Sequence, residues 1–220
     1  MPPVLSESQC RHLRMIFERG AAAASLALSR WLGEDVRLSI SEVEQVDLAE
    51  AAGVLGPAEA LVAACAMGLS GPLGGQILLV FEDRAGLALA DLLLRQPPGT
   101  AKDWGELERS AAMETTNIVG CAYLNALAAH LPGGLAKPDG GDGPGEELVP
   151  SPPTFLHEFA GSLLEFALMD QALELDRVLL VHTAFATGRR ELSLDWTLLF
   201  VPDHASLRAL AGAIGELESH

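Results

Sequence analysis

The two halves of the sequence repeat one another, and this repeat limits the folds open to the chain more than any other feature. A shift of 99 positions places Leu28 on Leu127. A shift of 120 positions places Ile77–Leu87 (ILLVFEDRAGL) on Thr197–Leu207 (TLLFVPDHASL). Such a repeat implies two similar helix–strand–strand–helix units, related by a pseudo-twofold axis and sharing one sheet with helices packed on it.

Hydrophobic periodicity and turn residues predict the elements of each unit. The first half should contain a helix from the N-cap Ser6 to the C-cap Gly33, a strand Val36–Val46, a polar turn Leu48–Pro57, a hairpin of Leu61–Gly71 and Gln76–Glu82, and a helix Ala85–Arg95 capped by Asp83. The second half should contain a helix Lys102–Leu131, a loop Pro132–Pro153, a helix Thr154–Leu173, a hairpin of Val178–Ala186 and Leu192–Val201, and a helix Ala205–Leu217 capped by Asp203.

These elements predict an α/β fold of the α+β type, with long helices packed on the shared sheet. We expect one domain over residues 1–220, made of repeat unit 1–100 and repeat unit 101–220. The length suits a single large domain or two small packed ones, and the apolar fraction of 49% supplies a substantial core.

Charge and cysteine usage exclude several classes of function. A formal net charge of −16 repels phosphate backbones and anionic lipids, so nucleic-acid binding is not expected. No apolar run is long enough to cross a bilayer, and the N-terminus lacks the pattern of a signal peptide, so we expect no membrane insertion. Three widely spaced cysteines indicate a reducing compartment, the cytoplasm. The six histidines show no metal-ligand spacing, and no metal site is expected.

A polar stripe interrupts the apolar pattern of the predicted helix Lys102–Leu131. Ser110, Glu114 and Asn117 stand at i, i+4 and i+7, which places their side chains along one line of the helix surface. Asparagine is a mediocre helix former, about 0.7 kcal/mol worse than alanine, so the place of Asn117 in the middle of a helix indicates a functional role. The alternative is an ordinary solvated stripe, which spacing alone does not exclude.

The same helix carries a resemblance to a known family. The segment GELERSAAMETTNIVGCAYLNALAAHL, followed by LVPSPP, resembles the CheC/CheX/FliY phosphatases of bacterial chemotaxis. The signature of that family is Asp or Ser, three residues, Glu, two residues, Asn, and a proline beyond the helix. Ser110, Glu114 and Asn117 match it, and AYLNAL (Ala122–Leu127) and PSPP (Pro150–Pro153) follow in the expected order. Together with the internal repeat, the likeness covers nearly the whole chain.

The resemblance implies a hydrolase that removes the phosphoryl group from the aspartyl-phosphate of a CheY-like response-regulator receiver domain, in two-component signalling. Asn117 would position the attacking water, Glu114 would pair with a receiver lysine, and Ser110 would lie at the edge of the contact. Positioning is most of phosphoryl-transfer catalysis, so few groups are needed. The protein would need no cofactor of its own, because the receiver domain is expected to carry the Mg²⁺ ion.

The chain departs from the family in its first half. Family members typically carry the signature twice, but the shift of 99 positions places Ser110 on Arg11, Glu114 on Met15 and Asn117 on Glu18. We therefore expect one functional face and a degenerate, inactive first site.

The second departure is the loop 133–149, which is longer than the family usually shows. The alternative function is a non-catalytic adaptor with this fold that binds a receiver domain or a CheD-like deamidase.

Overall fold

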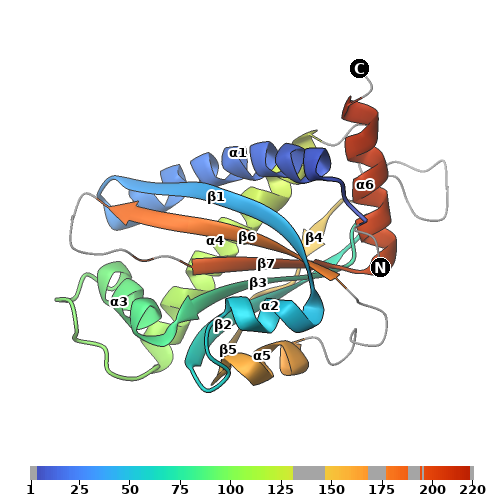
Figure 1. Ribbon diagram of the computed structural model, residues 1–220. Helices are drawn as coiled ribbons and strands as arrows, with labels where there is room; N and C mark the ends of the chain where they lie inside the picture. Colours follow the sequence, from blue (N-terminus) through green and yellow to red (C-terminus); the bar gives the residue numbers. More distant parts are fainter. Residues whose placement is uncertain (1–3, 131–146, 168–176, 188–193, 195, 219–220) are drawn as a thin grey trace.

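The computed structural model describes residues 4–130, 147–167, 177–187, 194 and 196–218. The described helices and strands are arranged around one curled antiparallel sheet (Figure 1). The elements are α1 (Glu7–Leu32), β1 (Val36–Asp47), α2 (Leu48–Val54), β2 (Leu61–Ser70), β3 (Gly75–Glu82), α3 (Asp83–Leu93), α4 (Glu106–His130), β4 (Val149–Pro150), β5 (Thr154–Phe159), α5 (Ala160–Ala167), β6 (Arg177–Thr187), β7 (Trp196–Pro202) and α6 (His204–Glu218).

The order of the strands in the sheet is symmetric. It runs β1-β6-β7-β3-β2, and β4 and β5 both pair with the outer edge of β2. Counted inwards from either end, the sheet shows an outer strand of one unit and then two strands of the other unit, so that β7 and β3 pair at its centre. In that pair Leu78 lies opposite Leu199 and Leu79 opposite Leu198, so the shift of 120 positions maps the ladder onto itself. The α+β fold predicted from the repeat is confirmed.

Local sequence signals account for the ends of α1 and for the first hairpin. The Ser6 side chain accepts from the Gln9 backbone N–H, and Gly33 ends the helix in the left-handed conformation with φ 73°. Strands β2 and β3 pair in register, and Gly75 (φ 125°) turns the chain where a Cβ would collide with the Val201 carbonyl oxygen. At the last helix, the Ser206 backbone N–H donates to the carboxylate of Asp203 at 2.7 Å, as predicted.

The predicted helix Thr154–Leu173 is wrong in its first third. Thr154–Phe159 forms strand β5, antiparallel to β2, and the helix α5 covers only Ala160–Ala167, while 168–173 lies outside the described residues. The apolar spacing of this segment fits both the period of an α-helix and the alternation of a β-strand. Pairing with the free edge of β2 decides the outcome, because it satisfies backbone groups that a helix would have left unpaired on that strand.

The boundaries of three other elements also differ from prediction. Helix α3 begins at Asp83, and its N-cap is Glu82, whose carboxylate accepts from the Ala85 N–H at 3.0 Å; the Asp83 cap is wrong. The polar turn Leu48–Pro57 contains the short helix α2. Helix α4 begins at Glu106, four residues later than expected. Most of the predicted loop Pro132–Pro153 and the turn of the second hairpin lie outside the described residues.

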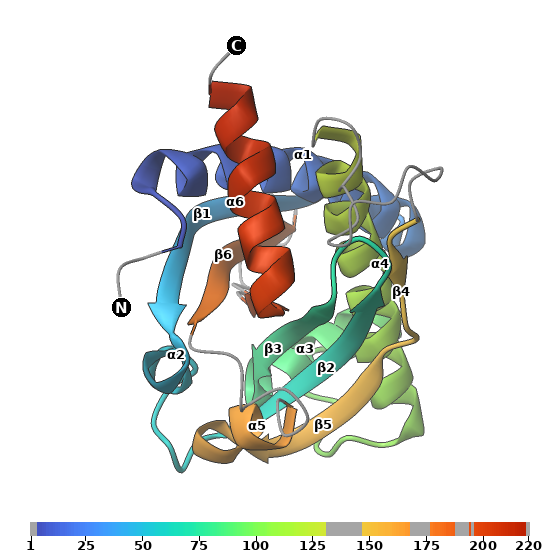
Figure 2. The same cartoon turned by 90° about the vertical axis from the view of Figure 1, so that its right-hand side faces the viewer.

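Helices cover both faces of the sheet and enclose two apolar cores (Figure 2). The larger core lies between the sheet and α1, α3, α4 and α6, and the smaller one lies under α2 and α5. Within the larger core α1 and α4 approach closely, because a Cβ at Gly20 would lie 2.9 Å from the Tyr123 Cα atom. This contact fixes the two long helices against each other on one side of the molecule. Among the described residues, no helix is both long and apolar enough to cross a membrane.

Candidate functional site

Two anchors fix the start of α4. The carboxylate of Asp91, only 1% exposed, accepts the backbone N–H groups of Gly99, Thr100 and Ala101 at 2.7, 3.0 and 2.8 Å. Asp83 accepts the indole N–H of Trp104 at 2.8 Å. The chain between α3 and α4 is therefore held at its middle and again just before α4 begins.

The Asp83 carboxylate of α3 also links Trp104, which precedes α4, to β5. His157 of β5 lies 2.9 Å from the same Asp83 oxygen, and Phe155 stacks near Trp104 with ring centroids 5.0 Å apart. The Arg109 guanidinium lies over the Phe155 ring and donates to the Trp104 carbonyl oxygen at 2.8 Å. The first turn of α4 is thus packed against a neighbouring strand, which makes the helix a rigid support for the residues that follow.

The buried side of α4 explains why the polar stripe faces solvent. The residues of α4 in the core are Ala111, Ala112, Thr115, Thr116, Val119, Gly120, Tyr123, Leu124, Ala126 and Leu127. The hydroxyls of Thr115 and Thr116 donate to the carbonyl oxygens four residues back, each at 2.9 Å, so these buried polar groups are satisfied within the helix. With that side packed, the opposite side carries Ser110, Glu114 and Asn117.

The structure places the three predicted site residues on one open face. Ser110 and Glu114 are exposed and Asn117 is half-buried. Within the described part of the chain, the Glu114 carboxylate has no ion-pair partner. An exposed carboxylate and a carboxamide one turn apart can bind a cation and a polar group of a partner surface.

A second residue of α4, Cys121, lies on the same face as Asn117, as its i+4 spacing in the sequence predicts. The Cys121 thiol donates to the Asn117 Oδ1 atom, with 3.6 Å between sulfur and oxygen. Burial, and secondly the nearby Glu114 charge, raise the pKa of Cys121, so at neutral pH the sulfur keeps the proton that it donates. Because Oδ1 has a second lone pair, the carboxamide can still accept a hydrogen bond from water.

The first helix shows a different surface at the equivalent positions. Arg11, Met15 and Glu18 are all exposed, Met15 to 52%. Glu18 pairs with Arg14 at 3.0 Å, and Arg11 lies 4.0 Å from Glu7. The exposure of these three residues places the predicted degenerate site on an open face of α1. The position that corresponds to Asn117 is Glu18, which has a carboxylate in place of the carboxamide. No cluster of three or more metal-ligating side chains occurs in the described ranges.

No family model matches the sequence, but solved structures do match the fold. FliY from Thermotoga maritima superposes with a TM-score of 0.71 at 14% identity, over 97% of this chain and 99% of that one. The FliM middle domain from H. pylori gives 0.66 at 14% identity, over 95% and 99%. The protein has the CheC/CheX/FliY-type fold.

A third structure with this fold was solved with a partner. It is the complex of CheX, CheY, BeF₃ and Mg²⁺ from Borrelia burgdorferi, with a TM-score of 0.50 at 14% identity, over 84% of this chain and 96% of that chain. The resemblance predicted from GELERSAAMETTNIVGCAYLNALAAHL and LVPSPP is confirmed at the level of the fold.

Proposed function

We propose that the protein is a phosphatase of phosphorylated receiver domains, with Asn117 and Glu114 as its catalytic residues. The observation that carries the proposal is the open face of α4, where the exposed Glu114 carboxylate and the half-buried Asn117 carboxamide lie one turn apart on the helix. A projecting helix can enter a shallow phosphorylation site on another protein. The CheX–CheY complex gives independent support, since a protein of this fold binds a receiver there.

The reaction is the hydrolysis of an acyl phosphate. A water oxygen forms a bond to phosphorus as the bond between phosphorus and the aspartyl oxygen breaks, and the water proton passes to the released phosphate or to solvent. Asn117 Oδ1 accepts a hydrogen bond from this water and holds it in line, while the carboxamide N–H donates to the phosphoryl group. The receiver domain supplies the Mg²⁺ ion, which neutralises phosphoryl charge.

Glu114 orients the approach in this proposal. Its carboxylate pairs with a lysine of the receiver domain, and Ser110, one turn earlier, contacts the partner at the edge of the interface. Glu114→Gln is expected to raise the KM for the phosphorylated receiver about tenfold, because the glutamine keeps the shape and loses the charge. Initial rates of phosphate release at varied receiver concentration measure this change. An unaltered KM would remove Glu114 from the proposed interface.

The thiol of Cys121 acts through Asn117 in this proposal. Cys121→Ala is expected to lower kcat about threefold to tenfold, a larger effect than on KM, because the carboxamide loses the donor that fixes its orientation. Cys121→Ser should restore most of the rate, since a hydroxyl also donates. Cys10→Ala, which removes a half-buried thiol on α1, is the matched control and should leave both constants unchanged. Equal rates for Cys121→Ala and the wild type would contradict the positioning role.

The decisive experiment measures the lifetime of the phosphoryl group on receiver domains from the same genome, with and without the protein. Shortening of that lifetime supports the phosphatase. The alternative is a non-catalytic adaptor, and one observation favours it: FliM from H. pylori shares the fold and was solved in complexes with FliG and with SpeE. Binding of a receiver domain or a CheD-like deamidase, with the phosphate lifetime unchanged, would identify an adaptor.

A further inference from the structure

We infer that the groove between α1 and α4 is a second docking point for the phosphorylated partner, which receives an apolar side chain next to a carboxylate of that partner. This inference rests on the proposed function and deepens it. The groove has a volume of about 460 Å³. Its lining residues come from both helices: Arg19, Ala23 and Ala27 from α1, and Ile118, Cys121, Ala122, Asn125, Ala126 and His130 from α4.

The groove is continuous with the polar stripe. Cys121 belongs to both, because it lines the groove and donates to Asn117. Ile118 is half-buried, packs against the larger core and also lines the groove. A partner that reaches Asn117 therefore also covers the groove. Four alanines are among the lining residues, and their small side chains leave room for a side chain from outside.

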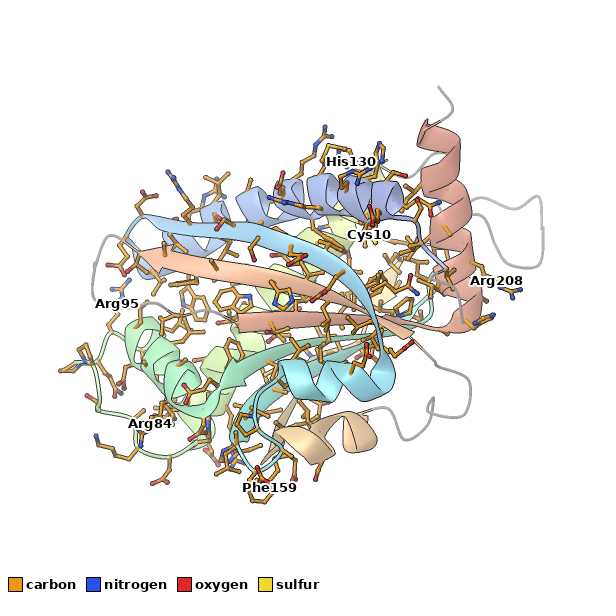
Figure 3. The ribbon with its side chains drawn as sticks, viewed as in Figure 1. Cys10, Arg84, Arg95, His130, Phe159 and Arg208 are labelled. Atoms are coloured by element: carbon orange, nitrogen blue, oxygen red, sulfur yellow. The ribbon has the colours of Figure 1, made fainter. Side chains whose placement is uncertain are left out.

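The rim of the groove carries positive charge. The His130 Nδ1 atom lies 2.8 Å from the Ala126 carbonyl oxygen, so this nitrogen carries the proton and Nε2 accepts from the Arg19 guanidinium. Figure 3 shows His130 beside α1. A guanidinium has five N–H donors, so Arg19 keeps others for a carboxylate. His130 is thus the support that holds Arg19 at the mouth of the groove.

Helix α1 is an exception in this acidic chain. It has four arginines and two glutamates, whereas the whole chain has a formal net charge of −16. A phosphorylated receiver presents negative charge around its phosphoryl group, and Arg19, the arginine of α1 that lines the groove, is complementary to it. Helix α1, which lacks the signature residues, would contribute affinity for the partner, while α4 contributes the residues that act on the phosphoryl group.

Two pairs of variants test this division, with the receiver domain that the wild type dephosphorylates. Ala23→Trp fills the groove, and Ala22→Trp adds the same bulk at an exposed position outside it. Arg19→Glu reverses the rim charge, and Arg30→Glu makes the same change at the exposed end of α1. We expect Ala23→Trp and Arg19→Glu to raise KM about tenfold with kcat unchanged, and both controls to behave as the wild type.

Failure of the inference is distinguishable from failure of the proposed function. If Ala23→Trp and Ala22→Trp give the same KM while Asn117→Ala is inactive, the groove is not a docking point and the phosphatase stands. If no receiver is dephosphorylated, the same variants are compared by calorimetric binding to receivers loaded with Mg²⁺ and beryllofluoride, a phosphoryl mimic. A selective loss of affinity in the groove variants then supports the docking point on an adaptor. Equal affinities, or no binding of the wild type, overturn it.

Discussion

Replacement of Asn117 by alanine is expected to lower kcat for receiver dephosphorylation by about 100-fold or more, with little change in receiver affinity. The reason is geometric. Asn117 is the only carboxamide in the described part of the polar stripe, and it is held by the Cys121 thiol one turn further along α4. Without it, water reaches the phosphoryl group in no preferred orientation. Single-turnover loss of the phosphoryl label measures the rate, and calorimetry with a beryllofluoride-loaded receiver measures the affinity.

The controls for this variant separate chemistry from folding. Alanine is the better helix former by about 0.7 kcal/mol, so Asn117→Ala should unfold at the same temperature as the wild type or slightly higher. Glu18→Ala makes the equivalent change on α1 and should leave kcat unchanged, since that face is proposed to be degenerate. A fall of less than about threefold for Asn117→Ala would refute the water-positioning role. A fall for Glu18→Ala would show that the first helix takes part in the chemistry.

Local signals in the sequence were sufficient for α1, the first hairpin and the exposed stripe of α4. The ends of α1 depend on Ser6, Gln9 and Gly33, which act within a few residues of themselves. The exposure of Glu114 follows from helical periodicity, because the apolar residues of α4 define one buried side. Features of this kind are set by neighbours along the chain, and the sequence contains them directly.

Features that depend on contacts between distant segments were not predicted. Strand β5 exists because β2 offers a free edge to it, and the paired residues Ala63 and His157 are 94 positions apart in the sequence. Asp83 accepts from Trp104 and His157, so it caps no helix. The groove depends on how α1 and α4 cross at Gly20 and Tyr123. Each of these outcomes is decided by tertiary packing, for which hydrophobic periodicity has no signal.

Replacement of Asp91 by alanine is expected to destabilise the fold by about 3 kcal/mol or more. The carboxylate is buried and accepts three backbone N–H groups of Gly99, Thr100 and Ala101. Alanine would leave these donors without an acceptor in the segment that leads into α4. For a chain of this size the loss corresponds to a fall of about 6–12 °C in Tm. Urea unfolding followed by circular dichroism gives the free energy of unfolding directly.

Two further variants identify the cause of that loss. Asp91→Asn keeps one oxygen acceptor in nearly the same shape, so it should destabilise less than alanine, by about half as much. Asp103→Ala removes the same negative charge from an exposed position in the same connection, and its effect should stay within about 0.5 kcal/mol. If Asp91→Ala and Asp103→Ala destabilise equally, the buried carboxylate does not anchor the connection, and the rigid placement of Glu114 and Asn117 has another source. If the predicted order holds, a residue outside the catalytic signature sets the position of the helix that carries it.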